Sequence, residues 1–101
     1  MEILDRRDGL QLSGPFDLSD AAELVAVLRE KDVTKLHCVD LPLEDGQALG
    51  VLLRDGVQPW LEREDRRLNL FVVQSGESWG VLWARLAGTR VRLVASRRVP
   101  G

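Results

Sequence analysis

The sequence is poor in the side chains that usually build covalent or metal-dependent sites. Cys38 is its only cysteine and His37 its only histidine. A single cysteine cannot form an internal disulfide, and the absence of a CxxC pair argues against a structural zinc site and fits a reducing cytosol. P-loop, GxGxxG, HExxH, GxSxG and EF-hand patterns are also absent. Any histidine-dependent catalysis would therefore have to use His37.

Long apolar runs are missing as well. None approaches the roughly 18–20 residues that a membrane-spanning helix requires, and the first nine residues, MEILDRRDG, lack the apolar core of a secretory signal. We therefore expect a cytoplasmic protein without a membrane span. The 101 residues, 45% of them hydrophobic and 30% charged, fit one folded domain over residues 1–101.

Charge is distributed unevenly along the chain. The net charge of −2 does not suggest a protein that binds nucleic acid. All sixteen acidic residues lie in positions 1–77, whereas positions 78–101 contain five arginines and no acid. These arginines are Arg85, Arg90, Arg92, Arg97 and Arg98. The basic segment either lies beside acidic surface of its own fold or forms a patch for an acidic partner or anionic lipid head groups.

Periodicity and turn residues predict the element order β-β-α-β-α-β-α-β. The predicted strands cover residues 2–7, 10–13, 35–41, 67–74 and 90–95, and the predicted helices cover residues 19–31, 45–64 and 77–87. From the third strand onward the chain forms βαβ units, whose right-handed crossovers give a mostly parallel sheet with helices packed on it. The fold class is therefore α/β.

Local signals set the ends of these elements. Asp8-Gly9 predicts the turn of a hairpin, and Asp17 or Ser19 can cap the first helix. Asp45 is expected to be the N-cap of the second helix, which Gly56 and Pro59 should kink or break near residues 55–59.

Two strands and the third helix carry further signals. The mostly apolar run 35–41 is typical of a central parallel strand covered on both faces. Ser75 is a possible cap of the third helix, and Gly88 is expected to end it in the left-handed conformation. The alternating run 90–95 fits an edge strand.

Few residues are candidates for chemistry. His37 and Cys38 are adjacent on a predicted strand, so their side chains point to opposite faces and cannot act together as base and nucleophile. Glu44 and Asp45 precede a helix, where a carboxylate can either cap the helix or belong to a site. Trp79 and Trp83 are four residues apart on a helix, so they either pack on the sheet or form an exposed stripe for a partner.

Several segments resemble the STAS family, the small domains of anti-sigma factor antagonists and sulfate-transporter tails. Residues 10–30 resemble its opening strand and first helix, and KLHCVDL at residues 35–41 resembles a strand that ends in an Asp-Leu pair, with Asp40 at the matching position. DGQALGVLL at residues 45–53 resembles the D-S-x-G-L-G-x-L-L signature that opens the second helix. RLNLFVV, ESWGVLWARLAG and RVRLV follow in family order, so the resemblance covers nearly the whole chain.

The departures from the family pattern bear on regulation. In family members that are switched by phosphorylation, a serine or threonine follows the signature aspartate, but Asp45 is followed by Gly46, Gln47 and Ala48. The loop from Asp40 to Asp45 is also shorter than usual, and Ala48 replaces the signature glycine. The resemblance therefore implies a divergent module without a phosphorylation switch in this turn.

The resemblance implies a non-enzymatic interaction module without a cofactor. Its partner would be an anti-sigma, kinase-like protein or the ATPase subunit of a lipid-transport complex of the ABC type, to which the chain could be an accessory subunit; a homodimer is a further possibility. Partner binding is expected at the start of the second helix. The expected residues are Glu44, Asp45, Gly46, Gln47, Leu49 and Gly50.

Two alternatives belong to other functional classes. A small-ligand-binding α/β domain or an enzyme would use the crevice at the carboxyl ends of the strands, near Asp40 and Asp45. A contact with a membrane surface or a nucleic acid would use the arginines of residues 85–98 and would weaken steeply with salt.

Overall fold

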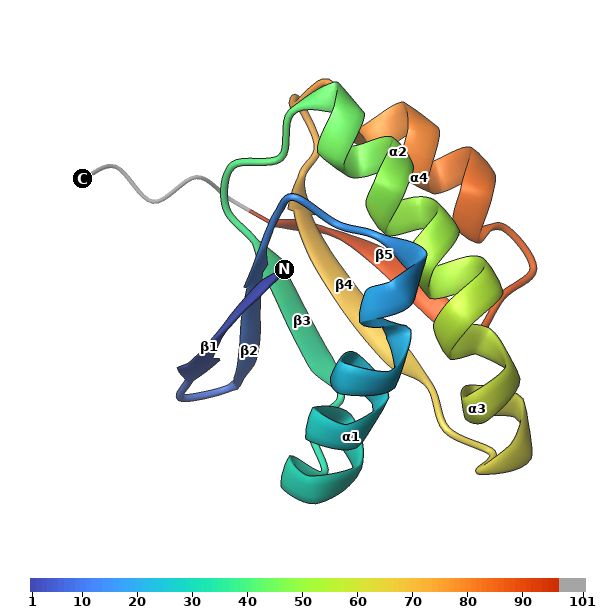
Figure 1. Ribbon diagram of the computed structural model, residues 1–101. Helices are drawn as coiled ribbons and strands as arrows, with labels where there is room; N and C mark the ends of the chain where they lie inside the picture. Colours follow the sequence, from blue (N-terminus) through green and yellow to red (C-terminus); the bar gives the residue numbers. More distant parts are fainter. Residues whose placement is uncertain (97–101) are drawn as a thin grey trace.

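The computed structural model describes residues 1–96 and contains one five-stranded sheet with helices packed on it (Figure 1). Arg97 and Arg98 of the basic segment lie outside the described residues. The strands are β1 (Glu2–Arg6), β2 (Gly9–Ser13), β3 (Lys35–Cys38), β4 (Leu68–Val73) and β5 (Val91–Ser96). The helical elements are η1 (Leu18–Asp20), α1 (Ala21–Lys31), α2 (Leu43–Val51), η2 (Leu52–Val57), α3 (Gln58–Arg63) and α4 (Trp79–Leu86).

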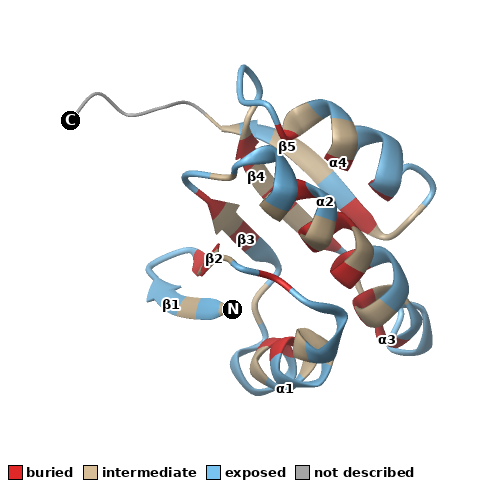
Figure 2. Ribbon diagram, turned by 45° about the horizontal axis from the view of Figure 1, so that its top comes forward, coloured by how far each residue is buried: buried red, intermediate tan, exposed pale blue. Residues whose placement is uncertain are grey.

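The strands lie side by side in chain order, β1-β2-β3-β4-β5. β1 and β2 are antiparallel, and the other neighbouring pairs are parallel. The predicted α/β class, element order and mostly parallel sheet are thus confirmed. Right-handed crossovers that always advance in one direction place every connecting helix on the same face of the sheet. Figures 1 and 2 show the helices gathered on that face.

Within residues 1–96, no helix lies over the opposite face of the sheet, so the prediction that residues 35–41 form a strand covered on both faces is wrong for the part of the chain that the structure describes. Burial alternates along β4: Leu68, Leu70 and Val72 are buried, whereas Phe71 and the other intervening residues are partly exposed. The order of the strands decides whether helices cover one face of the sheet or both, and this order was not known from the sequence. β3 is also shorter than predicted, because it ends at Cys38.

One hydrophobic core fills the space between the sheet and the helices. Its fully buried members include Leu36 and Leu70 from the sheet and Leu28, Leu52 and Leu61 from the helical layer. In the described part of the chain, no helix is long and apolar enough to cross a lipid bilayer.

The β1–β2 hairpin turns at Arg7-Asp8, because Arg6 pairs with Gly9 across the two strands. The predicted turn at Asp8-Gly9 is therefore wrong by one residue. Gly9 begins β2 with φ of +155°, and a Cβ added there would lie 3.0 Å from the carbonyl carbon of Lys35 and closer still to its oxygen. Glycine at this position thus allows β3 to approach the first residue of β2 closely.

The first helix begins with a 3₁₀ turn, so α1 starts two residues later than predicted, at Ala21. Asp17 accepts a hydrogen bond from the Ser19 amide at 2.9 Å, and Asp20 accepts one from the Asp17 amide at 2.9 Å. The predicted cap at Asp17 is confirmed. Its hydrogen bonds with Ser19 lower the pKa of Asp17, because they stabilise the charged form.

The second helical region is continuous from Leu43 to Arg63, but its middle is a π-helical stretch, η2. Pro59 has no amide hydrogen to donate, and the wider turns of η2 lie just before it. Gly56 allows a close approach to α1, because an added Cβ would lie 2.6 Å from the Ala21 Cβ. The predicted irregularity at residues 55–59 therefore takes the form of a π-helical segment that begins at Leu52.

The last helix and the last strand lie close to the residue ranges predicted for them. α4 covers Trp79–Leu86 with Ser78 as its N-cap, so the predicted cap at Ser75 is wrong. Gly88 has φ of +79°, which confirms the left-handed end of the helix. β5 lies at the edge of the sheet, as predicted.

On the face without helices, Gln11, His37 and Phe71 are in register on adjacent strands. The His37 ring stacks on Phe71 with 4.8 Å between the ring centroids and an interplanar angle of 16°. Its Nε2 lies 3.3 Å from a carboxylate oxygen of Asp8. His37 is therefore held between an aromatic ring and a carboxylate at the surface of the open face.

This environment predicts a pH dependence of stability. Burial lowers the pKa of His37 below the ordinary value of 6.5, and the charge of Arg6 lowers it further, while Asp8 opposes the shift. The unfolded chain therefore binds a proton more readily, and the free energy of unfolding should fall as the pH falls through 6.5 towards the folded pKa. Urea unfolding between about pH 5 and pH 8 measures this slope on both sides of the ordinary value of 6.5.

His37→Gln should reduce that slope, since it removes the titrating group. Asp8→Asn should steepen it, since Asp8 favours the protonated ring in the folded state. Equal slopes for the wild type and His37→Gln would show that His37 does not contribute to acid sensitivity.

Candidate functional site

Two loops meet at the carboxyl ends of the central strands. Residues 39–42 follow β3 and residues 74–78 follow β4, in front of the first turns of α2 and α4. Between the loops lies a shallow hollow of about 310 Å³. Its lining consists of Val39, Asp40, Leu41, Pro42, Gly76 and Glu77.

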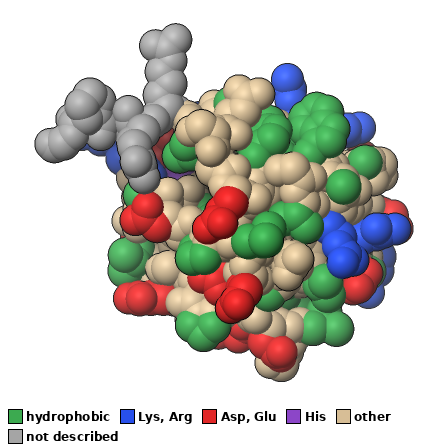
Figure 3. Space-filling view, turned by 90° about the horizontal axis from the view of Figure 1, so that it is seen from above, with side chains coloured by type: hydrophobic (Ala, Val, Ile, Leu, Met, Phe, Trp, Pro, Cys, Tyr) green, Lys and Arg blue, Asp and Glu red, His purple; other side chains and the backbone are tan. Residues whose placement is uncertain are grey.

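We define the carboxyl-end surface as six residues with exposed side chains that line this hollow or begin α2. They are Val39, Asp40, Pro42, Leu43, Glu44 and Glu77. Figure 3 views the molecule from this end and shows carboxylates interspersed with hydrophobic side chains. Val39 is 53% exposed and Leu43 is 42% exposed, so this surface carries two of the exposed large apolar residues of the protein.

Ser78 fastens the loop after β3 to the start of α4. Its side chain is 1% exposed, and it is the one polar residue buried among residues 1–96. The hydroxyl lies 2.5 Å from the carbonyl oxygen of Leu41 and 2.9 Å from that of Pro42, so its single hydrogen is shared between them. This contact fixes the loop that carries Val39 and leads into Leu43.

The second helix begins two residues earlier than predicted. α2 starts at Leu43 with Pro42 at the N-cap position, and Asp45 is its third residue. The prediction of Asp45 as N-cap is therefore wrong, because proline's fixed φ suits the start of a helix without a capping side chain. Glu44 and Asp45 lie in the first turn, where negative charge interacts favourably with the helix dipole.

The structure divides the residues expected to bind a partner into two groups. Glu44 and Gln47 are exposed and Asp45 is partly exposed, whereas Gly46, Leu49 and Gly50 are buried. The buried three cannot offer side-chain contacts to a partner. They instead lie beneath the exposed residues of α2 and support them.

The two buried glycines allow α4 to pack closely against α2. A Cβ added at Gly46 would lie 2.5 Å from the Ser78 Cβ, and one added at Gly50 would lie 3.2 Å from the Arg85 side chain. Position 46 therefore has no room for a side chain that carries a hydroxyl, because α2 and the start of α4 pack closely there.

Sequence reasoning missed Val39 and Glu77 as surface residues of this site. Val39 was included in a strand that in fact ends at Cys38, and Leu43 was placed in a loop. The signal that could have identified Leu43 as the first residue of the helix is Pro42, since proline is common at the first positions of helices.

The carboxyl-end surface is acidic. Asp40, Glu44 and Glu77 surround its apolar residues, and the surface includes no lysine or arginine. Glu44 and Glu77 form no ion pair within residues 1–96. Their charges are therefore available to a cationic group from outside the chain.

His37 and Cys38 lie on opposite faces of the sheet, as adjacent strand residues must. His37 is on the open face, whereas Cys38 is buried in the core. Burial raises the pKa of the Cys38 thiol to about 12, which disfavours the reactive thiolate. Among the described residues, no three His, Cys, Asp or Glu side chains lie close enough together to hold a metal ion.

The two tryptophans of α4 have different environments. Trp79 is partly buried against the core, whereas Trp83 is 62% exposed. Their rings stack with 6.1 Å between centroids. One tryptophan thus anchors the helix and the other reaches the surface.

Comparison with known proteins identifies no relative, since no family model, curated protein or solved structure matches the chain.

Proposed function

We propose that the protein is a non-enzymatic interaction module that docks a partner protein through the carboxyl-end surface. The observation that carries this proposal is the exposure of Val39 and Leu43 on a loop and helix start that Ser78 holds in place. Exposed apolar side chains on a rigid support are typical of binding surfaces, because they need no ordering when the partner arrives.

The charges of this surface define the chemistry of the partner. Glu44 and Glu77 lie beside the apolar centre, so the partner presents an apolar contact with lysine or arginine around it. By its resemblance to STAS domains, the chain is proposed to act as an anti-sigma factor antagonist-like regulator. The partner is then a kinase-like anti-sigma protein, or the ATPase subunit of a transport complex.

Docking at this turn is proposed to operate without a phosphorylation switch. α2 contains no serine or threonine, and the Ser78 hydroxyl behind it is buried and hydrogen-bonded. Glu44 and Asp45 instead place permanent negative charge in the first turn, where a phosphate would otherwise add about −1.5 to −2 charges.

Charge reversal tests the electrostatic part of the proposal. Glu44→Lys combined with Glu77→Lys should weaken partner binding, and the remaining binding should lose its dependence on salt between about 50 and 200 mM. Glu23→Lys with Glu30→Lys on the exposed side of α1 changes the net charge equally and serves as the control. Calorimetric titration at two salt concentrations measures both effects, and equal losses in the two double variants would contradict a local role of the surface.

Site-specific cross-linking in cells that naturally contain the protein tests the proposal as a whole. A photoreactive amino acid replaces Leu43 in one variant and, as a matched control, Leu4 on β1 in another; the two leucines are 42% and 48% exposed. We expect one major adduct from position 43 that is absent from position 4. The same adducts from both positions, or none from position 43, would refute docking at this surface.

A further inference from the structure

The two edges of the sheet differ in how they are protected against further strands. β1 carries Glu2, Asp5 and Arg6, and charged side chains of this kind discourage the addition of another strand. β5 has the sequence VRLVAS, with Arg92 as its only charge. An apolar edge strand with unpaired backbone groups is a template for another strand.

Hydrogen bonds identify the backbone groups that point outward from β5. The Leu68 amide donates to the Arg90 carbonyl at 3.0 Å, so Arg90 faces β4 and alternate residues from Val91 onward face away. The Val91 amide donates to the Thr89 hydroxyl at 3.2 Å. The outward amides and carbonyls of Leu93 and Ala95 remain, since β5 pairs with β4 alone within residues 1–96.

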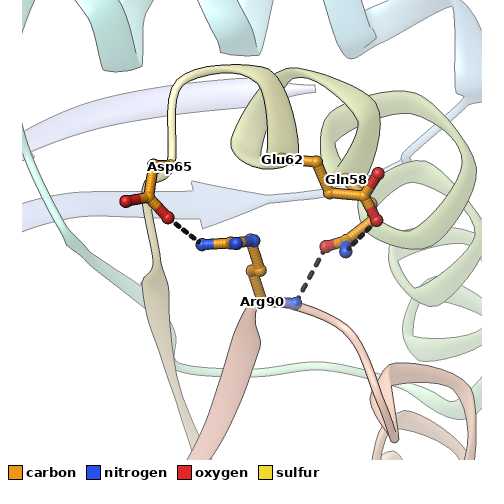
Figure 4. Close-up of polar contacts among 4 residues, drawn as sticks. All are labelled: Gln58, Glu62, Asp65 and Arg90. Atoms are coloured by element: carbon orange, nitrogen blue, oxygen red, sulfur yellow. Dashed lines mark hydrogen bonds and ion pairs between the residues drawn. The ribbon is translucent and has the colours of Figure 1, made fainter.

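The start of β5 is fixed in place. The Arg90 amide donates to Gln58 Oε1 at 2.8 Å, and its guanidinium donates to Asp65 Oδ1 at 2.8 Å (Figure 4). Gln58 in turn donates to Glu62 at 3.0 Å. The edge is therefore a preformed support, and the charge of Arg90 is already paired.

A hollow of about 530 Å³ lies along the same edge, between α4 and β5. Trp83, Leu86 and Leu93 contribute apolar lining, and Arg67 and Arg92 also line it. Both arginines are exposed, and neither has a carboxylate partner among residues 1–96. The edge thus combines backbone groups, an exposed indole and two unpaired positive charges.

We propose that the β5 edge is a strand-addition site for an extended, acidic segment of a partner protein. The segment pairs its backbone with Leu93 and Ala95, places a large apolar side chain against Trp83, and places carboxylates beside Arg67 and Arg92. The site is separate from the carboxyl-end surface, and the two surfaces have opposite charge.

Charge argues against a second copy of this chain as the occupant. Two-fold pairing of β5 with itself would place beside Arg92 a strand, VRLVAS, that contains no carboxylate, so the positive charges of the two copies would add without being neutralised. An acidic segment instead neutralises these charges.

Selection from a random dodecapeptide phage library tests the site without knowledge of the partner. The immobilised proteins are the wild type, the double variant Arg67→Glu and Arg92→Glu, and a control with Arg54→Glu and Arg63→Glu, which changes two exposed arginines elsewhere. Wild type and control should enrich peptides that alternate acidic with large apolar residues. These peptides should bind the Arg67→Glu and Arg92→Glu variant at least about tenfold more weakly.

A backbone variant separates strand addition from simple charge attraction. Ala95→Pro removes an outward amide and leaves the β4 ladder intact, so a selected peptide should bind it at least about tenfold more weakly. In ¹⁵N-labelled wild type, the same peptide should shift the Leu93 and Ala95 amides and the Trp83 indole. Failure to enrich acidic peptides, undiminished binding to Ala95→Pro, or shifts confined to other elements would overturn the proposal. A concentration-dependent dimer abolished by Ala95→Pro would also overturn it, because the occupant would then be a second copy.

Discussion

Gly46→Ala is expected to lower the free energy of unfolding by about 1–3 kcal/mol, the usual cost of overpacking a well-filled contact. Alanine is the better helix former, and the same change in an open helix position stabilises by about 0.8–1 kcal/mol. At Gly46 the sign reverses, because the added Cβ would lie 2.5 Å from the Cβ of buried Ser78. Either α4 moves away from α2 or the Ser78 hydroxyl loses its contacts with the loop.

Gly80→Ala is the matched control, since nothing lies within 4 Å of a Cβ added at that helical position. It should stabilise the protein, and Ser78→Gly in the Gly46→Ala background should relieve part of the clash. Urea unfolding of the four proteins measures these differences. If Gly46→Ala were as stable as the wild type, the close contact between α2 and α4 would not exist in solution.

Leu43→Glu is expected to weaken partner binding by at least about 30-fold, which corresponds to the roughly 2 kcal/mol that defines a central interface residue. The substitution adds a charge to an already acidic surface and removes one of its two largest apolar contacts. Because Leu43 is 42% exposed, the folded protein should tolerate the change. Calorimetric titration with the cross-linked partner, after its purification, measures the affinity.

Leu4→Glu, on β1, provides the comparison for this variant, because it introduces the same charge at a similarly exposed leucine. It should leave the affinity unchanged. Equal weakening by both substitutions would indicate a general effect of charge and would argue against a local contact at Leu43.

The element order could be predicted from the sequence because it depends on local signals. Apolar periodicity marked the helices, and Gly88 ended α4 in the left-handed conformation as expected. The open face of the sheet could not be predicted, because it follows from the strand order and not from any one segment. Partly exposed Phe71 and His37 are apolar or weakly polar, so β3 and β4 resemble strands buried on both faces.

The exposure of residues at the start of the second helix could be predicted only in part. Glu44 and Gln47 are exposed as expected, but the burial of Gly46 and Gly50 depends on α4, which lies about thirty residues further along the chain. Ser78 carried no local signal for its role, because its partners are the carbonyls of Leu41 and Pro42.

Amide hydrogen exchange of the protein, alone and bound to its cross-linked partner, tests docking at the carboxyl-end surface most directly. Exchange should slow in residues 39–47 and 74–78, which form the two loops and the first turn of α2, and should stay unchanged in β1 and β2. Protection of the open sheet face with no change at residues 39–47 would contradict the proposed function.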